Sequence, residues 1–175
     1  LPAVIAQKML GIEDLREIYL LRRILTHLLF LAACCCMFLL TDLMFRNRLV
    51  AGAAFLMLWL HPHIFAHSFF NSKDLPFLSF LVISIFLLCL ALDRRKWIFF
   101  CAAGLATGLL TGTRIMGILY LALGAAWLVV EIFTQKDKRV LMTGLLLYTL
   151  FSCLTLYASW PYLWGDPFSH FMEAF

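Results

Sequence analysis

The chain consists of long apolar stretches separated by short charged loops, and this alternation restricts its fold more than any other feature. Each stretch has about 17 to 20 residues, the length that an α-helix needs to cross the apolar core of a bilayer. Inside lipid the backbone must satisfy its own hydrogen bonds, which a helix does. The sequence therefore predicts an all-α bundle of about six transmembrane helices, at residues 24–40, 49–66, 77–92, 97–113, 115–133 and 140–160.

Composition supports the same fold class. Hydrophobic residues make up 64% of the chain and charged residues 14%, whereas a soluble domain is roughly half apolar and about a quarter charged. No cleavable signal peptide is visible in residues 1–20. Apolar positions lie on one side of this segment and charged positions on another, which predicts an interfacial helix before the first span.

The ends of the chain suggest that it is part of a longer protein. It starts at Leu1 instead of a methionine, and it stops at Phe175 within an expected helix. We therefore expect residues 1–175 to form a single transmembrane domain that belongs to a larger membrane domain.

Lys and Arg residues predict the orientation. They cluster in three loops, at residues 46–48, 94–96 and 136–139. Cytoplasmic loops carry such an excess, so these loops are expected on the cytoplasmic side. The segment 61–76 and the turn at Arg114 then lie on the non-cytoplasmic side, together with most of the unusual polar residues.

The segment HPHIFAHSFFNSKDLP, residues 61–76, contains much of the polar chemistry of the chain. Pro62 lacks an N–H and disfavours helix at the preceding residue, so the second span should end or kink there. His63 and His67 are four residues apart and share a face if one helical turn continues. They could hold a divalent metal ion or serve as hydrogen-bonded structure.

Two charged residues follow in the same segment, after the turn and capping types Asn71 and Ser72. Asp74 has two interpretations: a cap of the third span, or a catalytic carboxylate that acts as a base or a metal ligand. Lys73 could bind a phosphate or contact lipid headgroups.

Two arginines are further candidates for binding phosphate. Arg114 separates two apolar spans with almost no loop, so its guanidinium must lie at the interface or in a hydrated cavity, where its planar fork suits phosphate oxygens. Arg23 lies at the start of the first span, and its guanidinium is likewise expected at the interface or in a hydrated cavity. For both residues the alternative is that the side chain extends to the lipid headgroups.

Small residues recur every four positions at Gly104, Gly108 and Gly112. This spacing leaves one helical face without side chains, so that a neighbouring helix can approach closely. We expect a packing role for these glycines.

Four segments occur in an order that resembles a known family: LLRRILTHLLF, LHPHIFAHSFFNSKDLPF, GLATGLLTGTRIMGILYL and WPYLWGDPFSHFMEAF. The chain resembles the GT-C glycosyltransferases that use polyprenyl-phosphate sugars, a group that includes protein O-mannosyltransferases and the lipid A aminoarabinose transferase. The resemblance covers most of the chain. It matches Arg23, Pro62, Asp74 and Arg114 to family positions, although the family usually has a lysine where Arg114 stands.

The resemblance implies an inverting glycosyltransferase. Its donor would be a dolichyl- or undecaprenyl-phosphate sugar, and its acceptor a hydroxyl of a protein or lipid-linked glycan on the non-cytoplasmic side of the bacterial inner membrane or the endoplasmic reticulum. Asp74 would be catalytic, and Arg23, Lys73 and Arg114 would bind the donor phosphate. Partners would include membrane lipids and no nucleic acid.

The cofactor is not identified by the sequence, beyond a divalent metal ion that His63 and His67 could hold. The family carries an acidic catalytic motif in its first external loop, and this chain has no counterpart. The principal base is therefore expected upstream, and these 175 residues alone are expected to be inactive.

Two other classes of protein fit parts of the sequence. In a transporter or channel, Asp42, Asp74 and Arg114 would line a pathway, but no inverted repeat is apparent. In a membrane cytochrome, His27 and one of the histidines at 61, 63 and 67 would be axial haem ligands.

Overall fold

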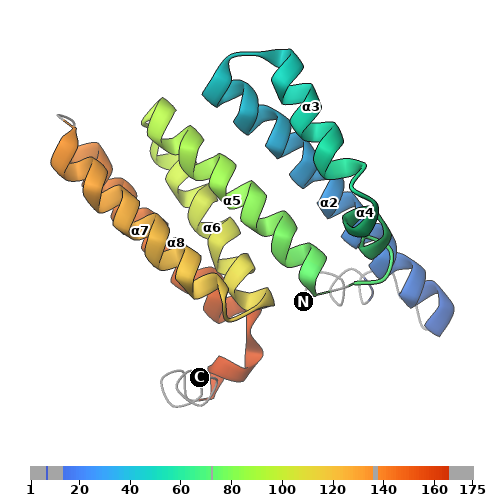
Figure 1. Ribbon diagram of the computed structural model, residues 1–175. Helices are drawn as coiled ribbons and strands as arrows, with labels where there is room; N and C mark the ends of the chain where they lie inside the picture. The colour runs from blue at the N-terminus through green and yellow to red at the C-terminus, as the bar shows by residue number, and fades with distance from the viewer. Residues whose placement is uncertain (1–6, 8–13, 72, 136–137, 166–175) are drawn as a thin grey trace. The chain divides into compact units, whose positions relative to one another are not determined.

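The computed structural model describes residues 7, 14–71, 73–135 and 138–165, and within them the protein is all-α, as predicted. No strand occurs among these residues. The helices are α2 (Leu15–Phe45), α3 (Arg48–Trp59), α4 (Pro62–His67), α5 (Asp74–Arg94), α6 (Trp97–Thr113), α7 (Gly117–Thr134) and α8 (Lys138–Ser159), followed by the 3-10 helix η1 (Pro161–Trp164) (Figure 1).

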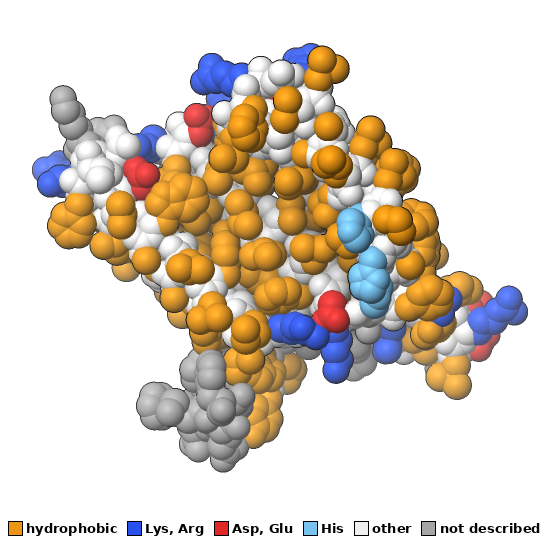
Figure 2. All heavy atoms as spheres, viewed as in Figure 1, with side chains coloured by type: hydrophobic (Ala, Val, Ile, Leu, Met, Phe, Trp, Pro, Cys, Tyr) orange, Lys and Arg blue, Asp and Glu red, His pale blue; other side chains and the backbone are white. Residues whose placement is uncertain are grey.

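Four of the described helices, α2, α5, α7 and α8, are long and apolar enough to span a membrane. Two apolar helices are shorter: α3 has 12 residues and α6 has 17. Hydrophobic side chains cover much of the surface that Figure 2 shows. A chain of this kind is suited to being embedded in a membrane, because its apolar helices satisfy their own backbone while their surfaces remain apolar.

Helix α2 begins earlier than the first predicted span, which was placed at residues 24–40. Of residues 1–20, expected in an interfacial helix that leads into that span, residues 15–20 form the first turns of α2, which continues without a break to Phe45. Most of the other residues of that segment lie outside the described residues. Asp14 caps this helix, since its side chain accepts a hydrogen bond from the backbone N–H of Arg16 at 3.1 Å. The helix ends where Arg46 adopts a left-handed conformation with φ of 51°.

The break predicted at Pro62 is confirmed. Helix α3 ends at Trp59, and α4 begins at Pro62. His61 precedes it in an extended conformation, with its Nδ1 3.5 Å from the backbone nitrogen of Ile64. Proline suits the first position of a helix because its missing N–H would have no partner there. The predicted second span is therefore divided into two helices.

The chain forms two compact units, Leu1–Val82 and Ile83–Phe175, and each is described by itself. In the first unit α3 runs back alongside α2 (Figure 1). Its buried core comprises Phe30 and Cys34 of α2 and Leu75 of α5, against which Trp59 and Ile64 pack. The expectation of a single transmembrane domain stays a prediction.

In the second unit α6 packs closely against α8, as the glycine spacing predicted. A Cβ atom added at Gly108 would lie 2.6 Å from the carbonyl oxygen of Ser152 and 2.6 Å from Cβ of Thr155. The Ser152 hydroxyl also donates a hydrogen bond to the carbonyl of Gly104 at 3.2 Å. The absence of side chains at these glycines is therefore what permits contact between the two backbones.

Candidate functional site

The candidate site lies in the first unit, where the turn between α4 and α5 meets the start of α2. Two small cavities occur there. The first, here called the arginine pocket, has a volume of about 110 Å³ and is lined by residues that include Tyr19, Arg22, Arg23, Ser68, Phe70 and Asn71. The second, the histidine pocket, has a volume of about 150 Å³ and is lined by residues that include His63, Ile64, His67, Asn71, Asp74 and Leu75.

Asn71 lines both cavities, so the two pockets are neighbours. Cavities for drug-sized ligands usually measure about 300–1,000 Å³. Each pocket is smaller than that and would suit one chemical group of a larger ligand. Together they could accommodate two groups that react with each other.

The side chain of Asn71 organises the start of α5. Its Oδ1 accepts hydrogen bonds from the backbone N–H groups of Lys73, at 3.1 Å, and Asp74, at 2.8 Å. Backbone N–H groups can only donate, so the atom that faces them must be the amide oxygen. Asp74, one of whose predicted roles was that of a cap, is the first residue inside α5; Asn71 provides these two capping bonds.

The amide nitrogen of Asn71 faces the other way, toward the side chains of two candidate site residues. Its Nδ2 donates to Oδ2 of Asp74 at 2.8 Å and lies 3.2 Å from Nδ1 of His67. Because Nδ2 carries only hydrogens, Nδ1 of His67 must be the acceptor. In the neutral imidazole the proton is then on Nε2.

This linking role of Asn71 was not predicted from the sequence, which indicated only a turn or capping residue. The sequence feature that could have indicated this role is the spacing of Asn71, which follows His67 by four residues and precedes Asp74 by three. Such spacings bring side chains together only if the intervening turn has the right conformation.

The two histidines of α4 lie together, as their spacing predicted. The ring centres of His63 and His67 are 4.3 Å apart, and histidine side chains gather on the surface over α4, among hydrophobic side chains (Figure 2). No group of three or more His, Cys, Asp or Glu side chains in the described ranges could hold a metal ion.

The metal role of His63 and His67 thus stays a prediction. Histidines that bind a metal usually donate their second ring N–H to an acceptor. For His67 the hydrogen bond runs in the opposite direction, from Asn71 to the ring. This geometry favours His67 as a hydrogen-bond donor through Nε2.

Arg23 is held in the arginine pocket by two aromatic rings. Its guanidinium carbon lies 3.9 Å from the ring centre of Tyr19 and 5.2 Å from that of Phe70. One terminal nitrogen donates to the Tyr19 hydroxyl at 2.6 Å. The Nε atom of Arg23 is buried and has no hydrogen-bond partner among the described residues. A buried N–H of a cation without a partner calls for an explanation, and an anionic ligand would provide one.

His27 has a structural role beside the arginine pocket. The hydroxyl of Ser68 donates to the carbonyl of Phe65 at 2.6 Å, so Nδ1 of His27, 3.1 Å from the same hydroxyl oxygen, must be the donor. The His27 ring also stacks on Phe69, with ring centres 4.9 Å apart. These contacts fasten the turn before α5 to α2.

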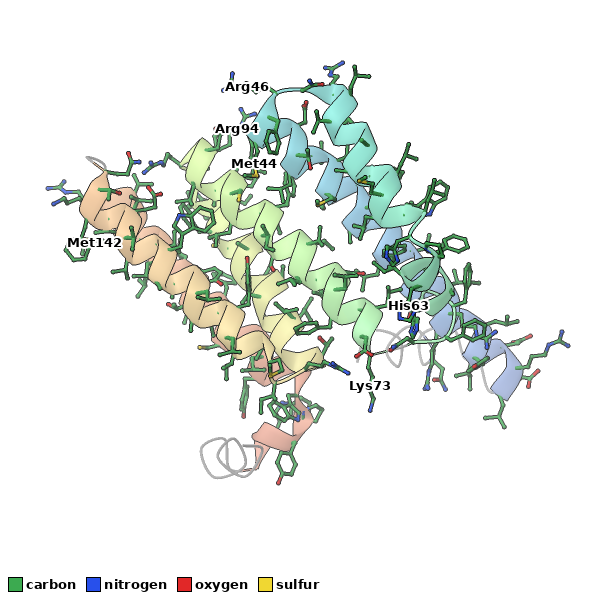
Figure 3. The ribbon with its side chains drawn as sticks, in the orientation of Figure 1. Met44, Arg46, His63, Lys73, Arg94 and Met142 are labelled. Atoms are coloured by element: carbon green, nitrogen blue, oxygen red, sulfur yellow. The ribbon has the colours of Figure 1, made fainter. Side chains whose placement is uncertain are left out.

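The remaining predicted phosphate-binding residues lie elsewhere. Lys73 is exposed and its side chain extends away from the helices (Figure 3). Arg114 belongs to the second unit, where it ends α6 in an extended conformation. With Thr111, Thr113 and Trp160 it lines a cavity of about 290 Å³. Only three residues separate α6 from α7, in agreement with the nearly loopless turn expected at Arg114.

No family model matches the chain, and no curated protein or solved structure matches it. The geometry of the two pockets is therefore the firmest guide to function. It brings Arg23, His67 and Asp74 to adjoining cavities at one turn of the first unit.

Proposed function

We propose that the protein is an inverting glycosyltransferase that moves a sugar from a polyprenyl phosphate to an acceptor hydroxyl on the non-cytoplasmic face of a membrane. The observation that carries this proposal is the adjacency of the two pockets. One offers a buried guanidinium N–H that has no partner among the described residues, and the other offers a carboxylate and a histidine. The resemblance to GT-C enzymes supports the same function.

The chemistry requires these two kinds of group side by side. The acceptor oxygen forms a bond to the anomeric carbon of the sugar, while the bond from that carbon to the phosphate oxygen breaks. The hydroxyl proton passes to a carboxylate, here Asp74. The polyprenyl phosphate leaves with the bonding electron pair, and its growing negative charge is stabilised by Arg23.

A lipid-linked donor also requires a site at the membrane surface. Helix α2 is long and apolar enough to span a membrane, and both the arginine pocket and the charged residues Arg22 and Arg23 lie near its N-terminal end. A phosphate bound there would lie at the interface while its prenyl chain remains in the lipid. The distribution of Lys and Arg among the loops supports a non-cytoplasmic location for this end.

Replacement of Arg23 should separate a phosphate ligand from an anchor of the helix end. Arg23→Ala is expected to lower turnover of a polyprenyl-phosphate sugar by roughly a hundredfold, the cost of removing one donor that stabilises transition-state charge. Arg23→Lys should retain part of the activity, because the charge remains while the planar fork is lost. Initial rates of transfer from a radiolabelled donor, in membranes containing the intact protein, measure both effects.

The control for Arg23 is Arg16→Ala, on the same helix. Arg16 is exposed and does not line the arginine pocket. Its variant should transfer sugar at the wild-type rate. Equal rates for Arg23→Ala and Arg16→Ala at matched expression would contradict the phosphate role.

The orientation can be tested by cysteine labelling. In a protein whose native cysteines have been replaced, a membrane-impermeant thiol reagent applied to intact cells is expected to modify Lys73→Cys and to spare Gln135→Cys. Both positions are exposed, so a difference in labelling reports the side of the membrane. The reverse pattern would put the site on the cytoplasmic face and exclude an external acceptor.

A further inference from the structure

We propose that Asn71 is a positioning residue that orients the carboxylate of Asp74 and fixes the tautomer of His67. This inference rests on the proposed function, because it assigns Asn71 a role in the same site. It also states which ring nitrogen of His67 carries the proton, and this can be measured without an assay of sugar transfer.

The orientation of Asn71 is determined by its hydrogen bonds. An amide side chain offers two acceptor positions on oxygen and two N–H donors. Oδ1 accepts from Lys73 and Asp74, and Nδ2 contacts Asp74 and His67, so all four positions are used. A rotation that exchanged oxygen and nitrogen would turn N–H groups toward two backbone N–H groups.

The same contacts couple the fold to the site. Asn71, which caps the start of α5, also holds the carboxylate of Asp74, the first residue of that helix. A carboxylate held by a hydrogen bond is oriented before the acceptor binds, which reduces the entropy cost of reaching the reactive geometry. His67, with its proton on Nε2, then lines the histidine pocket as a hydrogen-bond donor.

Asn71→Asp separates positioning from capping. Aspartate caps a helix about as well as asparagine, so the start of α5 should persist. The variant has no N–H to give, and a second acceptor faces Nδ1 of His67 in its place. The proton of His67 should therefore move to Nδ1, or the ring should become doubly protonated.

The chain contains a matched control. Asn47 caps α3 in the same way, since its Oδ1 accepts from the N–H groups two and three residues ahead, at 3.0 Å for Leu49 and 3.4 Å for Val50. Asn47 lines neither pocket. Asn47→Asp makes the same chemical change at a helix start away from the site.

Two measurements on the intact, detergent-solubilised protein test the inference. The first is the ¹⁵N NMR spectrum of labelled histidine, with the His67 signals assigned by their loss in His67→Gln. The wild-type protein and Asn47→Asp should show a bare Nδ1 and a protonated Nε2, whereas Asn71→Asp should show a protonated Nδ1. The same His67 spectrum in all three proteins would overturn the inference.

The second measurement is the rate of sugar transfer. Asn71→Asp should lower kcat by about a hundredfold, the effect of a misplaced reacting group, with the KM for the donor unchanged. Asn47→Asp should have the wild-type kcat. An equal kcat for the two variants would overturn the positioning role even if the tautomer changes.

A further variant keeps the test decisive if Asn71→Asp does not fold. Asn71→Ser retains a capping oxygen and adds no charge, yet it also lacks the amide donors, so it should lose kcat in the same way. Failure of the proposed function is distinguishable: a wild-type protein that transfers no sugar would refute that function, while the NMR result would still decide whether Asn71 sets the tautomer of His67.

Discussion

Asp74→Asn is expected to leave folding and expression unchanged and to lower sugar transfer by roughly a hundredfold or more. Asparagine has the same shape, and the backbone N–H of residue 74 can still donate to Asn71. The new side chain can also present an oxygen to the Asn71 amide. What it cannot do is accept the hydroxyl proton, because a neutral amide is not a base at ordinary pH.

Transfer from a lipid-linked sugar in membranes, at matched expression, measures this effect. Asp14→Asn is the control, since Asp14 also stands at a helix start and its side chain accepts a backbone N–H at 3.1 Å. Asparagine preserves that cap, and the rate should not change. If Asp74→Asn also transfers sugar at the wild-type rate, the only role of Asp74 is to stabilise the start of α5. The base must then come from another part of the intact protein.

Helix α6 was the element best predicted from the sequence. The predicted span, residues 97–113, has the same bounds as the observed helix, Trp97–Thr113. Lys96 and Arg114 flank a largely apolar run without any charged residue, and charged residues that remain outside the lipid mark both ends of such a run. Charged residues at both ends of a run that contains none therefore allowed the bounds of α6 to be predicted from the sequence.

The start of α2 was predicted less well, for a physical reason. Residues 15–20 carry charges, which suggested an interfacial helix leading into a span that begins only at residue 24. No glycine or proline occurs between Leu15 and Phe45, so nothing in the backbone interrupts the helix. Charges determine how deeply a segment can enter lipid, but they do not break a helix.

The candidate site was predicted only in part. The shared face of His63 and His67 follows from helical periodicity, and so does the contact of Arg23 with Tyr19, four residues before it. The bridge through Asn71 depends on the conformation of the turn after α4, and the contact of Arg23 with Phe70 depends on how that turn packs on α2. Neither is encoded in a periodic pattern, so the structure was needed to find them.

Gly108→Ala is expected to destabilise the second unit, although alanine is the better helix former. Replacing glycine inside a helix gains about 1 kcal/mol of helix propensity. At Gly108, however, the new Cβ would lie 2.6 Å from the carbonyl oxygen of Ser152 and 3.1 Å from the backbone nitrogen of Leu156. Backbone atoms cannot rotate away as a flexible side chain can, so α6 and α8 would have to separate along their contact.

Gly52→Ala in α3 makes the same substitution where nothing lies within 4 Å of the new Cβ. It should therefore keep or raise the midpoint of thermal unfolding in detergent. Overpacking costs about 1–3 kcal/mol or more, and for a chain of this size each kcal/mol corresponds to about 2–4 °C. The midpoint of Gly108→Ala should thus fall below that of Gly52→Ala by several degrees. A midpoint for Gly108→Ala as high as that of Gly52→Ala would mean that the backbones of α6 and α8 are not in contact, and that the glycine spacing reflects something other than the packing of these two helices.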